Sequence, residues 1–220
     1  MKTDAVIPNY NLHRIIDFNF SPVSEMDDSW WPQEHVTVAL FKQLKKISAA
    51  RRKLSDFILT RYQLKKEVYS DFSTPEKRIA LLSSADLKAL LYSLGLMIES
   101  DTIADVIEKE AQQAIKQSLG EEDYLYALKN RMVMRRLHRS DKMTTRNNKT
   151  YNYSDFRQQV YQSGLHCLLS LLDGMPKGFI QRILFKLPKT WDASLSNGSK
   201  DDYHYMSTHL PRLFKEFKLS

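Results

Sequence analysis

The sequence has little cysteine, glycine or proline, and these shortages narrow the possible folds. Its 220 residues include one cysteine, six glycines and seven prolines. A single cysteine excludes an internal disulfide and predicts a reducing, cytoplasmic setting. The shortage of glycine and proline disfavours a β-protein of many short strands, because tight turns depend on these residues. An all-α fold is therefore favoured.

Long hydrophobic runs are also missing. No segment reaches the roughly 18 uncharged apolar residues that cross a bilayer, and the N-terminus lacks the apolar core of a signal peptide. We therefore expect neither membrane insertion nor export by a cleavable signal. Hydrophobic residues make up 42% of the chain and charged residues 27%. These fractions are typical of soluble globular proteins, so a sizeable core is possible.

Charge is the most distinctive feature of the sequence. The net charge is +7, but it is segregated. Residues 34–66 carry nine Lys/Arg against two acids, which gives +7, and residues 129–149 carry eight against one, again +7. Between them, residues 99–126 carry eight acids against two lysines, which gives −6. Patches of both signs favour an assembly component over a dedicated polyanion binder.

Patterns typical of catalysis or cofactor binding are not found. The glycines never form GxGxxG or GxxxxGK[ST], so nucleotide binding by those routes is excluded. The histidines are scattered, and Cys167 beside His166 lies in an apolar run that predicts a buried structural cysteine. Acids clustered at 121–123 are explained by a helix N-terminus. We expect no enzyme activity, no metal and no cofactor.

The first part of the chain divides into a lead-in and the start of a helical domain. Residues 1–29 are weakly patterned, and the stretch from Phe18 to Pro22 is interpreted as a short extended element ended by proline. A single helical domain is expected over 30–220. Its first helix, with a break near Ser48, is indicated by apolar residues at helical spacing: Val36, Leu40, Leu44, Ile47, Leu54, Phe57, Ile58 and Tyr62.

Further helices are predicted by caps and periodicity. One begins at Ser83 or Ser84, and Gly95 within it indicates either close packing or an end at Leu94. Another runs from about Ser100 to a stop at Gly120. The remaining predicted segments are a third helix from 121, a flexible basic loop at about 140–153, a long helix from Ser154, a short one ended by Pro188, and a closing helix around 210–217.

Several segments of the chain together carry a family resemblance. They are Phe18-Asn19-Phe20-Ser21-Pro22, Ala80 to Leu87, Leu90 to Leu96, Leu119 to Leu128, Ser163-Gly164-Leu165, Lys186-Leu187-Pro188 and Trp191. In matching order and over most of the chain, they resemble the SctK family, the K subunit of the type III secretion sorting platform. Two departures are the absence of an aromatic residue after Pro22 and a more basic, longer stretch from Arg131 to Tyr151.

The resemblance implies a non-enzymatic adaptor at the cytoplasmic face of the bacterial inner membrane. Such a protein would link the cytoplasmic domain of the inner-membrane ring protein (SctD) to the pod protein (SctQ), which holds the stator (SctL) and the ATPase. No small-molecule substrate is implied, and nucleic acid is not an expected partner.

Docking is assigned to exposed basic residues, because opposite charges favour protein association. Arg51, Arg52 and Lys53 are the first candidate patch, toward an acidic partner surface, and Arg135 and Arg136 are the second. The alternative hypothesis is a regulator that binds nucleic acid through the two basic segments. Lys/Arg spaced along a helix suits phosphate contacts, although no recognisable nucleic-acid-binding module accompanies the charge.

Overall fold

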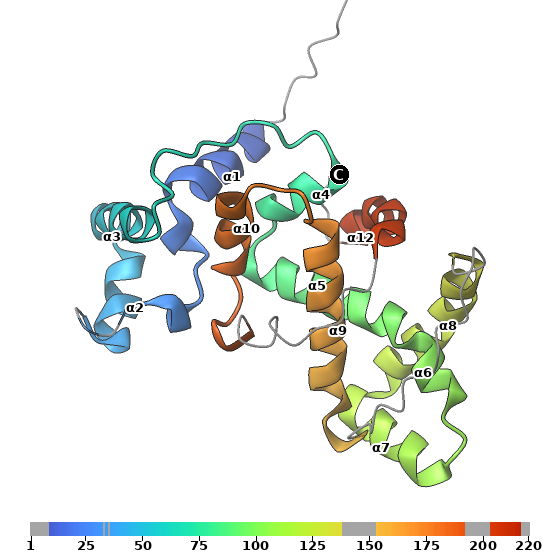
Figure 1. Cartoon of the computed structure of the whole chain (residues 1–220). Coiled ribbons are helices and arrows are strands. Elements are labelled where there is room, and N and C mark those ends of the chain that lie inside the picture. Colours follow the sequence, from blue (N-terminus) through green and yellow to red (C-terminus); the bar gives the residue numbers. More distant parts are fainter. Residues whose placement is uncertain (1–8, 33, 35, 138–152, 192–202, 217–220) are drawn as a thin grey trace, which may run out of the picture. The chain divides into compact units, whose positions relative to one another are not determined.

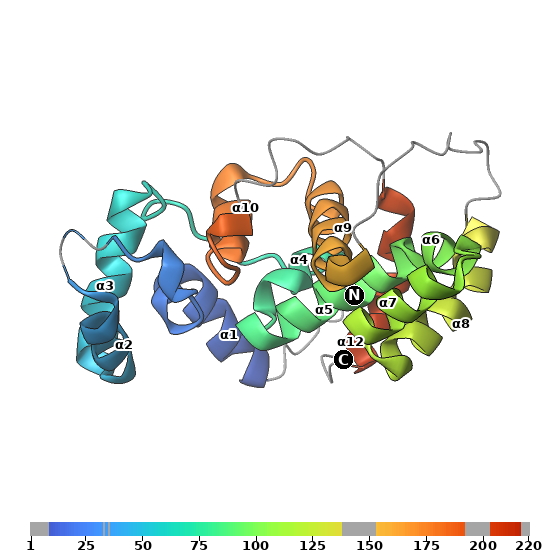
Figure 2. The ribbon, with the colours of Figure 1, turned by 90° about the horizontal axis from the view of Figure 1, so that it is seen from below.

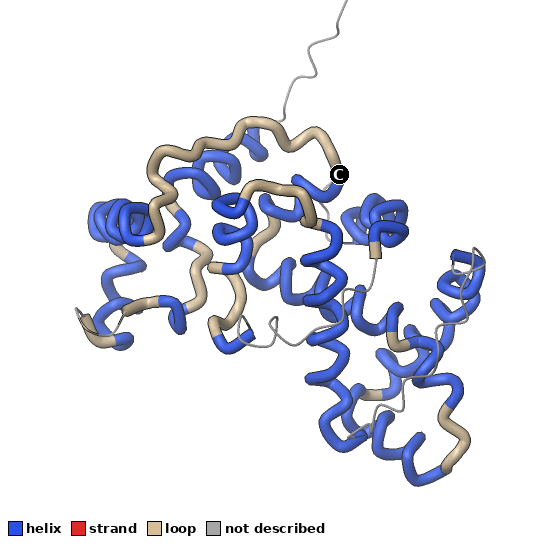
Figure 3. Tube along the Cα trace, in the orientation of Figure 1, coloured by secondary structure: helices blue, strands red, loops and turns tan. Residues whose placement is uncertain are grey.

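A computed structural model describes residues 9–32, 34, 36–137, 153–191 and 203–216. Within these ranges the regular structure is entirely helical (Figure 3), which confirms the predicted all-α class. None of the described helices combines the length and hydrophobicity that crossing a bilayer requires. The described part of the chain forms two compact units. The predicted basic loop falls almost wholly on residues 138–152, outside the described residues.

The first unit comprises described residues within 1–88, 172–197 and 210–220 (Figure 1). Its helices are α1 (Asn9–Phe20), α2 (Val38–Lys46), α3 (Ser48–Arg61), α4 (Pro75–Arg78), α10 (Lys177–Leu184) and α12 (Leu210–Glu216), with 3-10 helices η1 (Pro22–Ser24), η2 (Asp28–Trp30) and η3 (Ile79–Leu81). Its core joins buried residues from the N-terminal part of the chain with one that follows α10, among them Trp30, Phe41, Ile58 and Phe185. Helices α2 and α3 pack against each other (Figure 2).

The second unit comprises described residues within 89–171 and 198–209. It contains most of α5 (Ser84–Ile98), followed by α6 (Ser100–Asp105), α7 (Lys109–Leu119), α8 (Glu121–Leu137), α9 (Phe156–Leu171) and the 3-10 helices η4 (Tyr153–Asp155) and η6 (His204–His209). Its core gathers residues of α5, α7, α8 and α9, including Leu96, Ile115, Ala127 and Val160.

Glycines decide how α5 and α9 pack. A Cβ added at Gly95 would lie 1.9 Å from the carbonyl oxygen of Val160, and one added at Gly164 would lie 1.9 Å from that of Leu91. The two helix backbones therefore touch where both lack a side chain. Because α5 continues to Ile98, the close-packing interpretation of Gly95 is correct and a helix end at Leu94 is wrong.

Several predicted boundaries are confirmed by local chemistry. Helices α2 and α3 meet at Ile47, whose extended backbone (φ −91°, ψ 119°) makes the expected break. The hydroxyl of Ser83 accepts from the amide of Asp86 at 3.1 Å, which caps the start of α5. Gly120 ends α7 with φ 93°, a conformation that favours glycine.

Two predictions from the sequence are wrong. The stretch from Phe18 to Pro22 is not extended, since it contains the end of α1 and the first residue of η1. Asn19, within this stretch, has a local and a distant contact: its side-chain amide donates to the carbonyl oxygen of Ile15, in the preceding turn, at 2.9 Å and to that of Tyr69 at 2.7 Å. The helix predicted from Ser100 to Gly120 is divided into α6 and α7, because Val106 is extended (ψ 116°).

Candidate protein-docking surface

The first predicted patch lies on α3, near its junction with α2. Arg52 and Lys53 are exposed in the second turn of α3, whereas Arg51 is half-buried. Helix α2 begins after Thr37, whose hydroxyl accepts from the amide of Leu40 at 3.4 Å, and it ends with Lys45 and Lys46. Cations at a helix C-terminus are favoured by the helix dipole. We call Lys46, Arg52 and Lys53 the basic surface.

Ion pairs remove other cations of residues 34–66 from this surface. Asp28 lies 3.5 Å from Lys42 and 3.6 Å from Lys45. Two further pairs in the same region are Arg61 with Glu34, at 3.8 Å, and Lys65 with Asp56, at 2.5 Å. No carboxylate among the described residues pairs with the basic surface. Its three positive charges are therefore uncompensated within the described part of the chain.

Buried aromatic residues fix α2 and the segment before it. Trp31 stacks on Phe41 of α2, with ring centroids 4.4 Å apart. The indole N–H of Trp30 donates to the carbonyl oxygen of Leu187 at 2.7 Å. The ammonium group of Lys45 donates to the carbonyl oxygen of Met26 at 2.5 Å. These contacts pack α2, which carries Lys46 of the basic surface, against the rest of the first unit.

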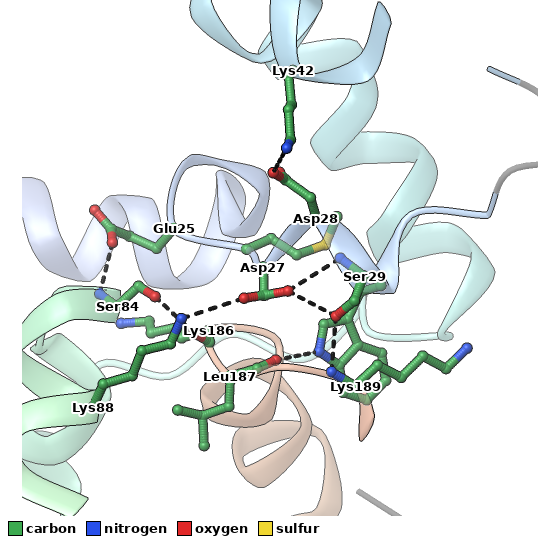
Figure 4. A network of polar contacts seen from close by, with 12 residues as sticks. Glu25, Asp27, Asp28, Ser29, Lys42, Ser84, Lys88, Lys186, Leu187 and Lys189 are labelled. Atoms are coloured by element: carbon green, nitrogen blue, oxygen red, sulfur yellow. Dashed lines mark hydrogen bonds and ion pairs between the residues drawn. The ribbon is translucent and has the colours of Figure 1, made fainter. Parts of the chain in front are cut away.

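A network of polar side chains joins the segment around Asp27 to the start of α5 (Figure 4). Asp27 accepts from the hydroxyl of Ser29 at 2.7 Å and pairs with Lys88 at 3.4 Å, and Glu25 accepts from the amide of Ser84 at 2.8 Å. Burial alone would raise the pKa of Asp27, but the hydrogen bonds from Ser29 and the charge of Lys88 outweigh it and lower that pKa. Asp27 is therefore held ionised.

Two buried cations of α10 and the residues after it hold the loops of the first unit. The ammonium of Lys186 donates to the carbonyl oxygens of Ala80, at 2.7 Å, and Leu82, at 2.5 Å. Burial lowers the pKa of Lys186 to about 8. The guanidinium of Arg182 donates to the carbonyl oxygens of Leu64 and Glu67, both at 2.8 Å. These charges serve internal structure rather than a partner.

Segments that carried the family resemblance meet in this region. The hydroxyl of Ser84 donates to the carbonyl oxygen of Lys186 at 2.7 Å, and the ammonium of Lys186 lies 5.9 Å from the ring centroid of Phe18. In the second unit, Ser163 donates to the buried carboxylate of Glu99. The matching segments therefore contribute to the packing of their units. The sequence did not identify Arg182 and Lys186 as cations that bind the backbone internally, since these acceptors are more than 100 residues away in the chain.

The second predicted patch lies in α8. Arg135 and Arg136 are within that helix, but their side chains lie outside what the structure describes. Arg131, one turn earlier, pairs with Asp101 at 3.0 Å and also with Asp105. Arg131, the part of this basic segment that the structure describes, therefore holds α6 against α8.

Other candidate chemistry is accounted for by packing. Cys167 is buried in α9, and burial raises the pKa of its thiol, so the interpretation as a structural cysteine agrees with its position. Across the residues that the structure describes, no three His, Cys, Asp or Glu side chains are grouped to hold a metal ion.

Comparison with known proteins identifies a family. The family model YOP proteins translocation protein K (YscK) matches residues 14–210. No curated protein and no solved structure matches the chain. Because the matched region covers well over half of the 220 residues, the chain belongs to the YscK family, which is the SctK family of type III secretion.

Proposed function

We propose that this chain is a non-enzymatic adaptor of the type III secretion sorting platform. It connects the cytoplasmic domain of the inner-membrane ring protein (SctD) to the pod protein (SctQ), and through SctQ to the stator (SctL) and the ATPase. It acts at the cytoplasmic face of the inner membrane without inserting into it. Family membership over residues 14–210 supports this role.

The observation that carries the proposal is the basic surface. Lys46, Arg52 and Lys53 are exposed, and no ion pair with a described residue neutralises them. Exposed charges of one sign steer and orient a partner that carries the opposite sign. We therefore assign Arg52 and Lys53, with Arg51 at their edge, to an acidic partner surface. Arg135 and Arg136 stay the second proposed patch.

The test measures binding of the purified full chain to the purified SctD domain and to SctQ, after nuclease treatment. We expect the wild-type chain to bind both. Changing Arg52→Glu and Lys53→Glu should weaken one of the two complexes several-fold, mainly through slower association and less so at high salt. The matched control changes Lys177→Glu and Lys215→Glu, two exposed lysines elsewhere in the first unit. Equal binding by both variants would remove Arg52 and Lys53 from the interface.

The same uncompensated cations also suit a second candidate function, that of a nucleic-acid-binding regulator. A chain that neutralises several phosphates loses affinity for DNA steeply as salt rises. Salt-dependent DNA binding that R52E/K53E abolishes, together with no binding to SctD or SctQ, would favour the regulator over the adaptor.

A further inference from the structure

Two apolar side chains of α2 and its C-cap face solvent instead of the core. Leu40 is 46% exposed and Ile47 is 55% exposed, although both belong to the apolar repeat from which the helix was predicted. Residues seven apart return to nearly the same side of a helix, about 10 Å apart along its axis. Phe41, on another side of α2, is fully buried. Phe41 therefore packs into the core, whereas Leu40 and Ile47 form a separate apolar stripe at the surface.

The apolar stripe and the basic surface both flank the junction between α2 and α3. Lys46 directly precedes Ile47, and Arg52 and Lys53 follow within the next two turns. The nearby exposed acids Glu34 and Asp56 already pair with Arg61 and Lys65. A partner that covers this surface thus meets two aliphatic side chains bordered by positive charge.

From this juxtaposition we propose that the surface binds an acidic amphipathic helix of a partner protein. Apolar residues of that helix, spaced by seven, pack on Leu40 and Ile47, while its Asp and Glu side chains meet Lys46, Arg52 and Lys53. This inference rests on the proposed adaptor function and gives the partner's contact a defined chemistry. A helix is the occupant that fits, because apolar anchors at i and i+7 match the axial spacing of the stripe.

Two other classes of partner fit these residues less well. Nucleic acid contacts proteins through phosphates and stacked bases, and neither uses an aliphatic stripe. Peripheral membrane binding relies on a broad apolar face, usually with aromatic residues. Two aliphatic side chains provide a small contact suited to a single helix.

The experiment measures the affinity of the full-length chain for the purified SctD domain and for SctQ separately. The apolar variant changes Leu40→Ser and Ile47→Ser, and its control changes Leu125→Ser, a residue of α8 that is equally exposed at 46%. Because these side chains are at the surface, circular dichroism and thermal unfolding should match the wild type. We expect L40S/I47S to weaken one complex roughly tenfold or more, and L125S to leave both unchanged.

A synthetic peptide tests the chemistry without either partner. One helical peptide carries leucines spaced by seven with flanking glutamates, and its twin carries lysines in place of the glutamates. We expect the full chain to bind the glutamate peptide, L40S/I47S and K46E/R52E/K53E to bind it more weakly, and the lysine peptide not to bind.

The outcomes separate the two levels of the proposal. A wild-type chain that binds SctD or SctQ while L40S/I47S binds them equally well overturns the helix inference and leaves the adaptor function standing. A chain that binds neither protein but prefers the glutamate peptide overturns the adaptor function and supports the surface chemistry. The L40S/I47S variant is also tested for binding to anionic phospholipid vesicles and to DNA. If it loses that binding while protein and peptide binding are unchanged, the assignment to a partner helix is overturned.

Discussion

Replacing Gly95 by alanine should destabilise the second unit, because this glycine allows α5 and α9 to touch. The added Cβ would lie 1.9 Å from the carbonyl oxygen of Val160, whereas ordinary contact begins at 3.4 Å. The two helices would have to separate by about 1.5 Å, since a backbone carbonyl within a helix cannot turn aside. The perturbation therefore acts on the packing of the whole helix pair.

The expected magnitude is a difference between two terms. Overpacking a close contact costs about 1–3 kcal/mol, and this backbone contact belongs at the upper end. Alanine gains about 1 kcal/mol over glycine within a helix. The free energy of unfolding should therefore fall by about 2 kcal/mol, which corresponds to a decrease of about 4–8 °C in Tm for a chain of this size.

The assay is urea and thermal unfolding followed by circular dichroism, with Gly178→Ala as the matched control. A Cβ at Gly178 would also meet an atom at 1.9 Å, the carboxylate oxygen of the exposed Glu67, and would lie 2.9 Å from Cδ2 of Leu64. Both atoms are the ends of side chains, which can shift where a helix carbonyl cannot. We expect G178A to stay within about 1 kcal/mol of the wild type. A G95A variant as stable as G178A would refute the conclusion that backbone contact at Gly95 holds α5 and α9 together.

Three further predictions concern single side chains. Folding lowers the pKa of Lys186 from 10.5 to about 8. Between these pH values the unfolded chain holds a proton that the folded chain has released. The free energy of unfolding should therefore rise by about 3 kcal/mol as the pH increases from 8 to 10.5. Urea titrations of the wild type and Lys186→Met over this range test it, because their stability difference would not change with pH if Lys186 titrated normally. Cys167, buried and with a raised pKa, should react with a thiol reagent only under denaturing conditions, and labelling as fast as that of free cysteine in the native state would contradict its burial. Trp30→Phe should lose the hydrogen bond to the carbonyl oxygen of Leu187. Urea unfolding should then show a loss of about 1–3 kcal/mol of stability, and a variant as stable as the wild type would show that the bond contributes nothing.

The candidate docking surface was only partly predictable. The charge segregation led to Arg52 and Lys53 as docking residues, and both side chains are exposed. The sequence could not distinguish Arg51, which is half-buried, from its neighbours, because all three share the same local pattern. Nor could it show that Leu40 and Ile47 face solvent, since a helical apolar repeat does not reveal how wide a face its neighbours cover.

The sequence by itself determined the helical class and the helix ends that depend on local chemistry. Gly120 stops α7 through its own backbone freedom, and Ser83 caps α5 through an acceptor three residues away. Tertiary structure decided the contact that holds the last turn of α1, since Asn19 bonds to Tyr69, 50 residues away. It also decided that the ammonium of Lys186 donates to the carbonyl oxygens of Ala80 and Leu82, more than 100 residues away in the chain. The physical reason is that capping and periodicity act within a few residues, whereas burial depends on which distant segments meet.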